Sequence, residues 1–138
     1  MNLSPAVVAE LRNEWAGVVS MRDRMQLLVV ATFGGGAITG VALQHVLYNL
    51  PLLLAFDVLK QALEAARAEK VFTCRLRQLG DLMECAKSTL DWKDWTSLRE
   101  GVRRRNEVAH DGKLFDGKQC LADIDNVEAQ LRSWQVIG

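Results

Sequence analysis

The segment from Arg103 to Gly112 reads Arg-Arg-Arg-Asn-Glu-Val-Ala-His-Asp-Gly and holds the side chains of this chain best suited to chemistry. His110 belongs to the one residue type that gives and takes protons near neutral pH. Arg105 carries a permanent charge on a planar fork of donors that matches phosphate or carboxylate. Asn106 adds an amide between them. These residue types together indicate binding or chemistry at an anion.

The spacing of this segment is typical of an amphipathic helix. At about 100° per residue, Leu98, Val102 and Ala109 share one sector of the helix, and Arg105 falls inside that sector. An unpaired charge in an apolar stripe is costly. Arg105 is therefore expected to meet an acid, a cluster of carbonyls, a second subunit or a bound anion.

The remaining polar residues of the segment divide between the edge of the stripe and the surface. Asn106 and His110 lie four positions apart and are expected to stack along one flank, beside Arg103. Arg104 and Glu107 are expected at the solvent-exposed surface. There, pairs such as Glu100 with Arg104 and Arg103 with Glu107 contribute little to stability.

Composition predicts a single all-α domain spanning residues 1–138. Almost half of the 138 residues are hydrophobic, enough for one core, and proline occurs only at Pro5 and Pro51. Short β-branched runs bounded by turns are missing. Seventeen basic side chains balance seventeen acidic ones, which excludes a polycation that coats nucleic acid. Residues 67–113 nevertheless hold eleven of the basic side chains, so an anionic partner would bind a local patch.

The apolar periodicity predicts a compact bundle of about five helices, with the Arg–His segment on the penultimate one. Ser4 caps a first helix that starts at Pro5 and runs toward Leu28, and Pro51 opens a helix that buries Leu52, Phe56, Leu59, Leu63 and Ala66. Further helices are expected over residues 38–49 and over residues 71–86, the latter with a kink at Gly80. After a connector over residues 88–95, Ser97 to Glu100 form a capping box, and Asp111-Gly112 end that helix. The last helix buries Leu121, Ile124, Val127, Leu131 and Trp134.

The stretch from Met25 to Phe56 has no formally charged residue and raises the question of a membrane span. The glycines at positions 34–36 divide it into two arms, each too short to cross a bilayer. A turn between two buried helices explains them better, because glycine adopts positive φ without steric cost. We therefore expect a soluble core and no stable membrane insertion, with membrane association as the alternative. His45, within this stretch, is expected to be a buried, hydrogen-bonded histidine.

The three cysteines, Cys74, Cys85 and Cys120, are widely spaced and lie among apolar residues. No pair has the Cys-x-x-Cys spacing of a zinc site, so no metal or other cofactor is expected. We expect reduced core thiols in a cytoplasmic protein. A secretory signal is not expected either, because charged residues interrupt the N-terminal segment.

The run Arg105-Asn106-Glu107-Val108-Ala109-His110 resembles the signature motif of the HEPN superfamily, an arginine followed by a polar residue and then, after a few positions, a histidine. A helical bundle with this motif on the penultimate helix is similar to the fold of that superfamily. The resemblance implies a metal-independent endoribonuclease that acts as a homodimer, a toxin or phage-defence effector with RNA as substrate and an antitoxin or regulator as a further partner.

The same resemblance assigns roles to individual residues. It implies that His110 is the acid or base, that Arg105 contacts the scissile phosphate and that Asn106 positions both. Apart from the resemblance, Arg103 and Arg99 belong to the local basic patch and are candidate contacts to RNA phosphates. Two motifs would meet across a two-fold axis to form one cleft. The alternative is a non-catalytic module of the same fold that binds RNA or a partner protein.

Overall fold

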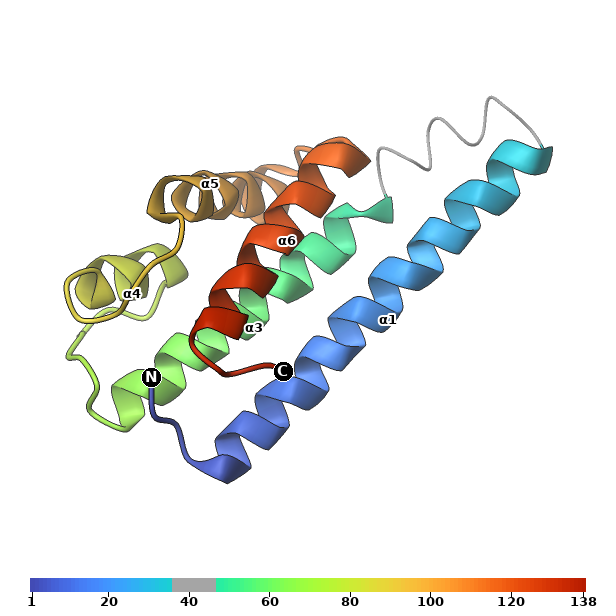
Figure 1. Ribbon diagram of the computed structural model, residues 1–138. Coiled ribbons are helices and arrows are strands. Elements are labelled where there is room, and N and C mark those ends of the chain that lie inside the picture. Colours follow the sequence, from blue (N-terminus) through green and yellow to red (C-terminus); the bar gives the residue numbers. More distant parts are fainter. Residues whose placement is uncertain (36–46) are drawn as a thin grey trace.

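The computed structural model describes residues 1–35 and 47–138, and these residues form five α-helices and no strand (Figure 1). The all-α class and the helical bundle predicted from the sequence are confirmed. The helices are α1 (Pro5–Gly35), α3 (Asn49–Ala68), α4 (Leu79–Ala86), α5 (Trp95–Asp111) and α6 (Gly117–Ser133).

Helix α3 is the centre of the bundle, since it packs against each of the other four helices. The apolar residues predicted to form its buried face recur at three-to-four spacing and are fully buried: Leu52, Phe56, Leu59, Leu63 and Ala66. In Figure 1, α1 lies on one side of α3, whereas α4 and α5 lie on the other. This arrangement leaves α4 and α5 side by side, where they form one surface of the molecule.

Several helix boundaries agree with the local signals in the sequence. Helix α1 starts at Pro5, and the Ser4 hydroxyl accepts a hydrogen bond from the Val7 amide at 3.4 Å. Pro51 lies in the first turn of α3. Helix α5 ends at Asp111 because Gly112 adopts a left-handed conformation with φ of 65°.

Two predictions concern the N-terminal third of the chain, and the described residues test only one of them. Helix α1 continues past Leu28 to Gly35, so Gly34 and Gly35 lie in its last turn. The helix predicted over residues 38–49 and the buried His45 concern residues 36–46, which are outside the described part of the chain.

The helix predicted over residues 71–86 is wrong in its first half, because only Leu79–Ala86 is helical. A disulfide joins Cys74 and Cys85, whose Cα atoms are 5.6 Å apart. In a continuous helix, eleven residues would separate those atoms by roughly 16 Å. The bond therefore requires the chain to turn back before α4. Leu76, which precedes α4, is 56% exposed, and Gly80 lies in the first turn of α4 rather than at a kink.

The prediction that all three cysteines are reduced is also wrong. Cys74 and Cys85 form the disulfide, and only Cys120 is free. The spacing of Cys74 and Cys85 in the sequence gave no reason to pair them, because their proximity depends on how α4 packs against the rest of the bundle. Burial raises the pKa of the Cys120 thiol to about 12, so this side chain stays protonated and behaves as a small core residue.

The residue that caps α5 is Asp94 rather than Ser97. The Asp94 side chain accepts a hydrogen bond from the Ser97 amide at 3.0 Å, and the helix begins at Trp95. Ser97 and Glu100 therefore lie within the helix, and the predicted capping box is wrong. Hydrogen bonds from Ser97 lower the pKa of Asp94, which keeps the capping carboxylate charged.

None of the helices in the described part of the chain is both long enough and apolar enough to cross a membrane.

The contact between α5 and α3 depends on Gly101. A Cβ atom at this position would lie 2.6 Å from Cζ of Phe56, which is buried in the core. We expect Gly101→Ala to lower the free energy of unfolding by about 1–3 kcal/mol, because the helices cannot separate without disturbing the core. Gly17→Ala is the matched control, since a Cβ there meets nothing within 4 Å and alanine favours the helix. Denaturant unfolding of both variants measures the difference, and equal stabilities would contradict this account of the packing.

Candidate functional site

A hollow of about 350 Å³ lies where α5 meets the first turns of α4 and the middle of α3. Its lining is mostly polar and combines both signs of charge. The residues that line it are Lys60, Gln78, Leu79, Gly80, Asp81, Glu84, Arg99, Arg105, Asn106 and His110. Four of the five residues predicted from the sequence to form a site therefore share one cavity, and only Arg103 is missing from it.

Helix α5 supplies these four residues because of its own periodicity. At about 100° per residue, Arg99, Asn106 and His110 fall within roughly 40° of one another on the helix. Leu98, which is buried, faces the core on a neighbouring sector. Arg105 lies close to that buried sector, and its long side chain reaches the hollow from there.

Arg105 is half-buried and lacks a carboxylate partner among the described residues. Its Nη1 donates to Oδ1 of Asn106 at 3.1 Å. Its Nε is buried and has no hydrogen-bond acceptor. A buried donor without an acceptor costs about 1–3 kcal/mol. Of the four partners expected for Arg105, an acid is not found among the described residues, whereas an anion entering the hollow would provide the missing acceptor.

His110 lies in the last turn of α5 and is exposed at one end of the hollow. Asn106, one turn earlier, is half-buried between His110 and Arg105 and fixes the guanidinium of Arg105 by accepting its hydrogen bond. The lining of the hollow therefore includes a cation, an amide and a group able to exchange a proton. This is an arrangement that could hold an anion and transfer a proton next to it.

Arg99 also faces the hollow, but its charge is already engaged. Its Nη1 donates to the Gly80 carbonyl at 3.1 Å, and its Nε lies 3.5 Å from a carboxylate oxygen of Glu84. Its guanidinium also lies over the ring of Trp95, 5.8 Å from the centroid. Arg99 therefore ties α5 to α4 and forms part of the wall of the hollow.

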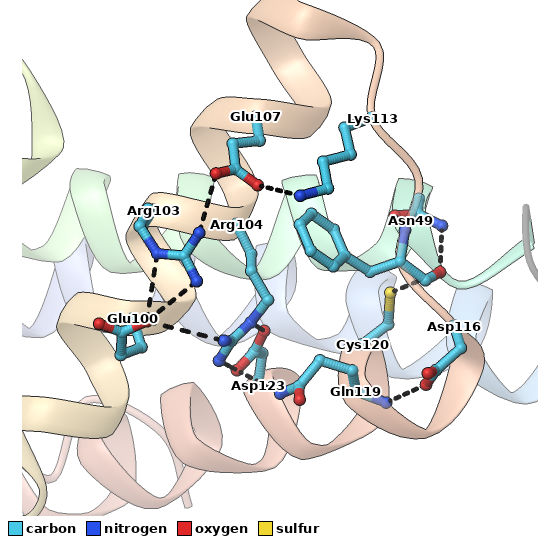
Figure 2. Close-up of polar contacts among 11 residues, drawn as sticks. Asn49, Glu100, Arg103, Arg104, Glu107, Lys113, Asp116, Gln119, Cys120 and Asp123 are labelled. Carbon is cyan, nitrogen blue, oxygen red and sulfur yellow. Dashed lines mark hydrogen bonds and ion pairs between the residues drawn. The ribbon is translucent and has the colours of Figure 1, made fainter.

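Arg103 does not line the hollow and is held by two carboxylates on its own helix (Figure 2). Its Nε and Nη2 each donate to Glu100 at 3.1 Å, and its Nη1 donates to Glu107 at 2.8 Å. These contacts raise the pKa of the Arg103 guanidinium, chiefly through the hydrogen bond to Glu100. The structure therefore places Arg103 apart from the other predicted contacts to phosphate.

The prediction that Arg104 lies at the surface is wrong. Its Nε and Nη2 donate to the two carboxylate oxygens of Asp123 in α6, both at 2.7 Å (Figure 2). The Asp123 side chain is 1% exposed and that of Arg104 is 14% exposed. The hydrogen bonds to Asp123 raise the pKa of Arg104. This paired geometry is the bidentate arrangement that arginine favours with a carboxylate.

Glu107 was also predicted to be solvent-exposed, and it is half-buried. Besides Arg103, it pairs with Lys113, whose Nζ lies 3.3 Å from its second oxygen. Lys113 follows the helix end at Gly112, so this pair folds the start of the next loop back onto α5.

Sequence reasoning missed the residues that complete the hollow from α3 and α4. Lys60 lies four residues before Glu64 on α3, and the two form an ion pair at 3.8 Å. Asp81, Glu84 and Gln78 carried no motif at all. Their role follows from how α4 docks against α5, which no local pattern encodes. Among the described residues, no group of three His, Cys, Asp or Glu side chains is placed to hold a metal ion.

Comparison with known proteins gave no match, whether with family models, curated proteins or solved structures.

The bidentate pair between Arg104 and Asp123 should contribute strongly to stability once formed. Replacing Arg104 with methionine would leave Asp123 buried and unpaired, and we expect a loss of about 3–5 kcal/mol in the free energy of unfolding. Arg132→Met is the matched control, since Arg132 forms an exposed 2.8 Å pair with Glu128. Urea unfolding of the two variants is the measurement, and a similar small loss in both would contradict the assignment.

Proposed function

We propose that this protein is a metal-independent endoribonuclease that acts as a homodimer in the cytoplasm, with Arg105, Asn106 and His110 as its catalytic residues. The observation that carries the proposal is Arg105, a half-buried guanidinium that lines the hollow without an acidic partner in the described part of the chain. It adjoins the amide and the histidine that the resemblance assigns to the same site.

The three residues would divide the reaction as follows. His110 accepts the proton of the ribose 2′-hydroxyl, whose oxygen then attacks the adjacent phosphorus. Arg105 stabilises the negative charge that develops on the phosphate oxygens, and Asn106 holds the Arg105 guanidinium in position. The 5′-oxygen leaves with a proton, and the products end in a 2′,3′-cyclic phosphate and a 5′-hydroxyl.

A homodimer would supply the second proton-transfer group that the proposed reaction uses. The reaction needs one group to take a proton and another to give one. His110 is the single histidine among the described residues. A second copy related by a two-fold axis would bring a second His110 and a second Arg105 to the same cleft.

Two carboxylates, Asp81 and Glu84, also line the hollow and repel phosphate. Glu84 is compensated by Arg99 and Lys60 pairs with Glu64, which leaves Arg105 as the cation of the hollow without an ion pair to a described residue. These acids favour the second candidate, a module that does not cut RNA, and in particular the form of it that binds a partner protein rather than RNA. Activity measurements separate the two.

We expect the purified protein to cleave single-stranded RNA equally well with and without EDTA. His110→Ala should lower the cleavage rate by about 10²–10⁴-fold and Arg105→Ala by about 10²–10³-fold. Arg12→Ala, which removes an exposed arginine of α1 on the other side of α3, should leave the rate unchanged. The measurement is the initial rate on a labelled RNA pool, with circular dichroism to show that each variant folds.

RNA that is bound but never cut, at any protein concentration, would overturn the nuclease and leave the binding module. Cleavage that survives His110→Ala would show that the activity does not belong to this hollow.

A further inference from the structure

The disulfide between Cys74 and Cys85 closes a loop over residues 74–85, which we call the disulfide loop. This loop supplies one whole wall of the hollow, from Gln78 to Glu84. It also carries Arg75 and Arg77, both exposed and neither in an ion pair with any described residue. Two free cations therefore lie within three residues of the hollow, on a segment that the catalytic assignment does not use.

The two ends of the disulfide loop are held in different ways. Within α4, Leu82, Met83 and Ala86 are fully buried in the core, so apolar packing anchors the second half. Residues 75–78 are all exposed. Besides the disulfide, the contacts that hold them are a 2.8 Å hydrogen bond from Arg67 to the Leu76 carbonyl and, at the start of α4, a 2.9 Å hydrogen bond from the Leu82 amide to the Gln78 carbonyl. Opening the disulfide would release the arginine-bearing half and leave α4 docked.

We propose that the disulfide loop is an RNA-binding arm of the hollow, in which Arg75 and Arg77 contact the backbone phosphates that flank the phosphate at Arg105. The redox state of Cys74 and Cys85 then controls the affinity of this arm for RNA. This inference rests on the proposed function, because it takes RNA as the ligand. With the bond intact, the two arginines are held on the segment that leads into Gln78, a lining residue of the hollow. With the bond open, the segment that carries the two arginines must become ordered when RNA binds, and the conformational entropy lost in that ordering weakens binding.

The exchange step uses a low-molecular-weight thiol as reductant. One reagent thiolate attacks a cysteine sulfur, which breaks the bond between Cys74 and Cys85 and forms a mixed disulfide. A second reagent thiolate then releases the protein cysteine and forms the reagent disulfide. Two electrons pass to the protein sulfurs, which take up two protons and become thiols. Both cysteines are half-buried, so a small reagent has access to them.

Binding is best measured by fluorescence anisotropy with a labelled 2′-O-methyl oligonucleotide, which lacks the attacking hydroxyl and cannot be cut. For the oxidised full-length protein, we expect Arg75→Ala with Arg77→Ala to weaken binding about tenfold and to reduce the salt slope by about two. Arg12→Ala with Arg24→Ala is the matched control, because it removes the same charge from exposed positions on α1. Equal losses in both double variants would overturn the arm.

The redox part is tested on the same oligonucleotide. Reduction of the wild-type protein with dithiothreitol, or replacement of Cys74 and Cys85 by serine, should weaken binding about fivefold, with the protein still folded by circular dichroism. Cys120→Ser, which removes the buried free thiol, should keep the full response to reduction. Unchanged affinity on reduction would overturn the proposal, and so would a disulfide that stays closed in glutathione buffers as reducing as the cytoplasm.

Failure of this inference is distinguishable from failure of the proposed function. Binding that ignores both the arginines and the redox state, alongside normal RNA cleavage, overturns the arm alone. Absence of any binding by the oxidised protein overturns both.

Discussion

The orientation of α5 depends on one interaction, the bidentate pair between Arg104 and the buried carboxylate of Asp123 in α6. A buried aspartate is costly unless paired, so the helix is held at the rotation that satisfies it. Arg105, one residue further and about 100° around the axis, must then face away from α6. Gly101 of α5 packs closely against Phe56 of α3, and this contact determines how near the two helices lie. These two constraints together direct Arg105, Asn106 and His110 to the side on which α4 lies.

The same packing explains why one of four neighbouring arginines has no acidic partner in the described part of the chain. Arg103 is held by Glu100 and Glu107, Arg104 by Asp123, and Arg99 by Glu84. Arg105 alone reaches a cavity with its Nε unsatisfied. A structural arginine would gain from an acid here, whereas a site for an anion needs the charge left free. The arrangement therefore favours a functional explanation for Arg105, and the disulfide loop would extend that site with two further cations.

Local signals in the sequence were sufficient for the fold class and for several helix ends. The ring of Pro51 restricts its own backbone angles, and Gly112 can adopt the left-handed conformation that ends a helix. The apolar spacing of α3 can be seen in the sequence alone. Predictions failed where two acceptable local choices competed. Asp94 and Ser97 are both good caps, and tertiary packing selected the first.

The site was only partly predictable for the same reason. The motif on α5 identified Arg105, Asn106 and His110, and the structure brings them together at one hollow. The apolar stripe alone could not show which arginine faces the core, Arg103, Arg104 or Arg105. The partner that decides this, Asp123, lies on another helix. The wall formed by α4 and the disulfide that shapes it depend on docking between segments, which periodicity along the chain does not report.

The central claim, that two subunits share one catalytic site, is tested most directly by mixing wild-type and His110→Ala subunits through joint unfolding and refolding, and measuring RNA cleavage against the wild-type fraction. If each site needs both histidines, only dimers with two wild-type subunits are active, and the rate follows the square of that fraction, falling to about one quarter at equal mixing. A rate that falls in simple proportion to the wild-type fraction would contradict the shared site.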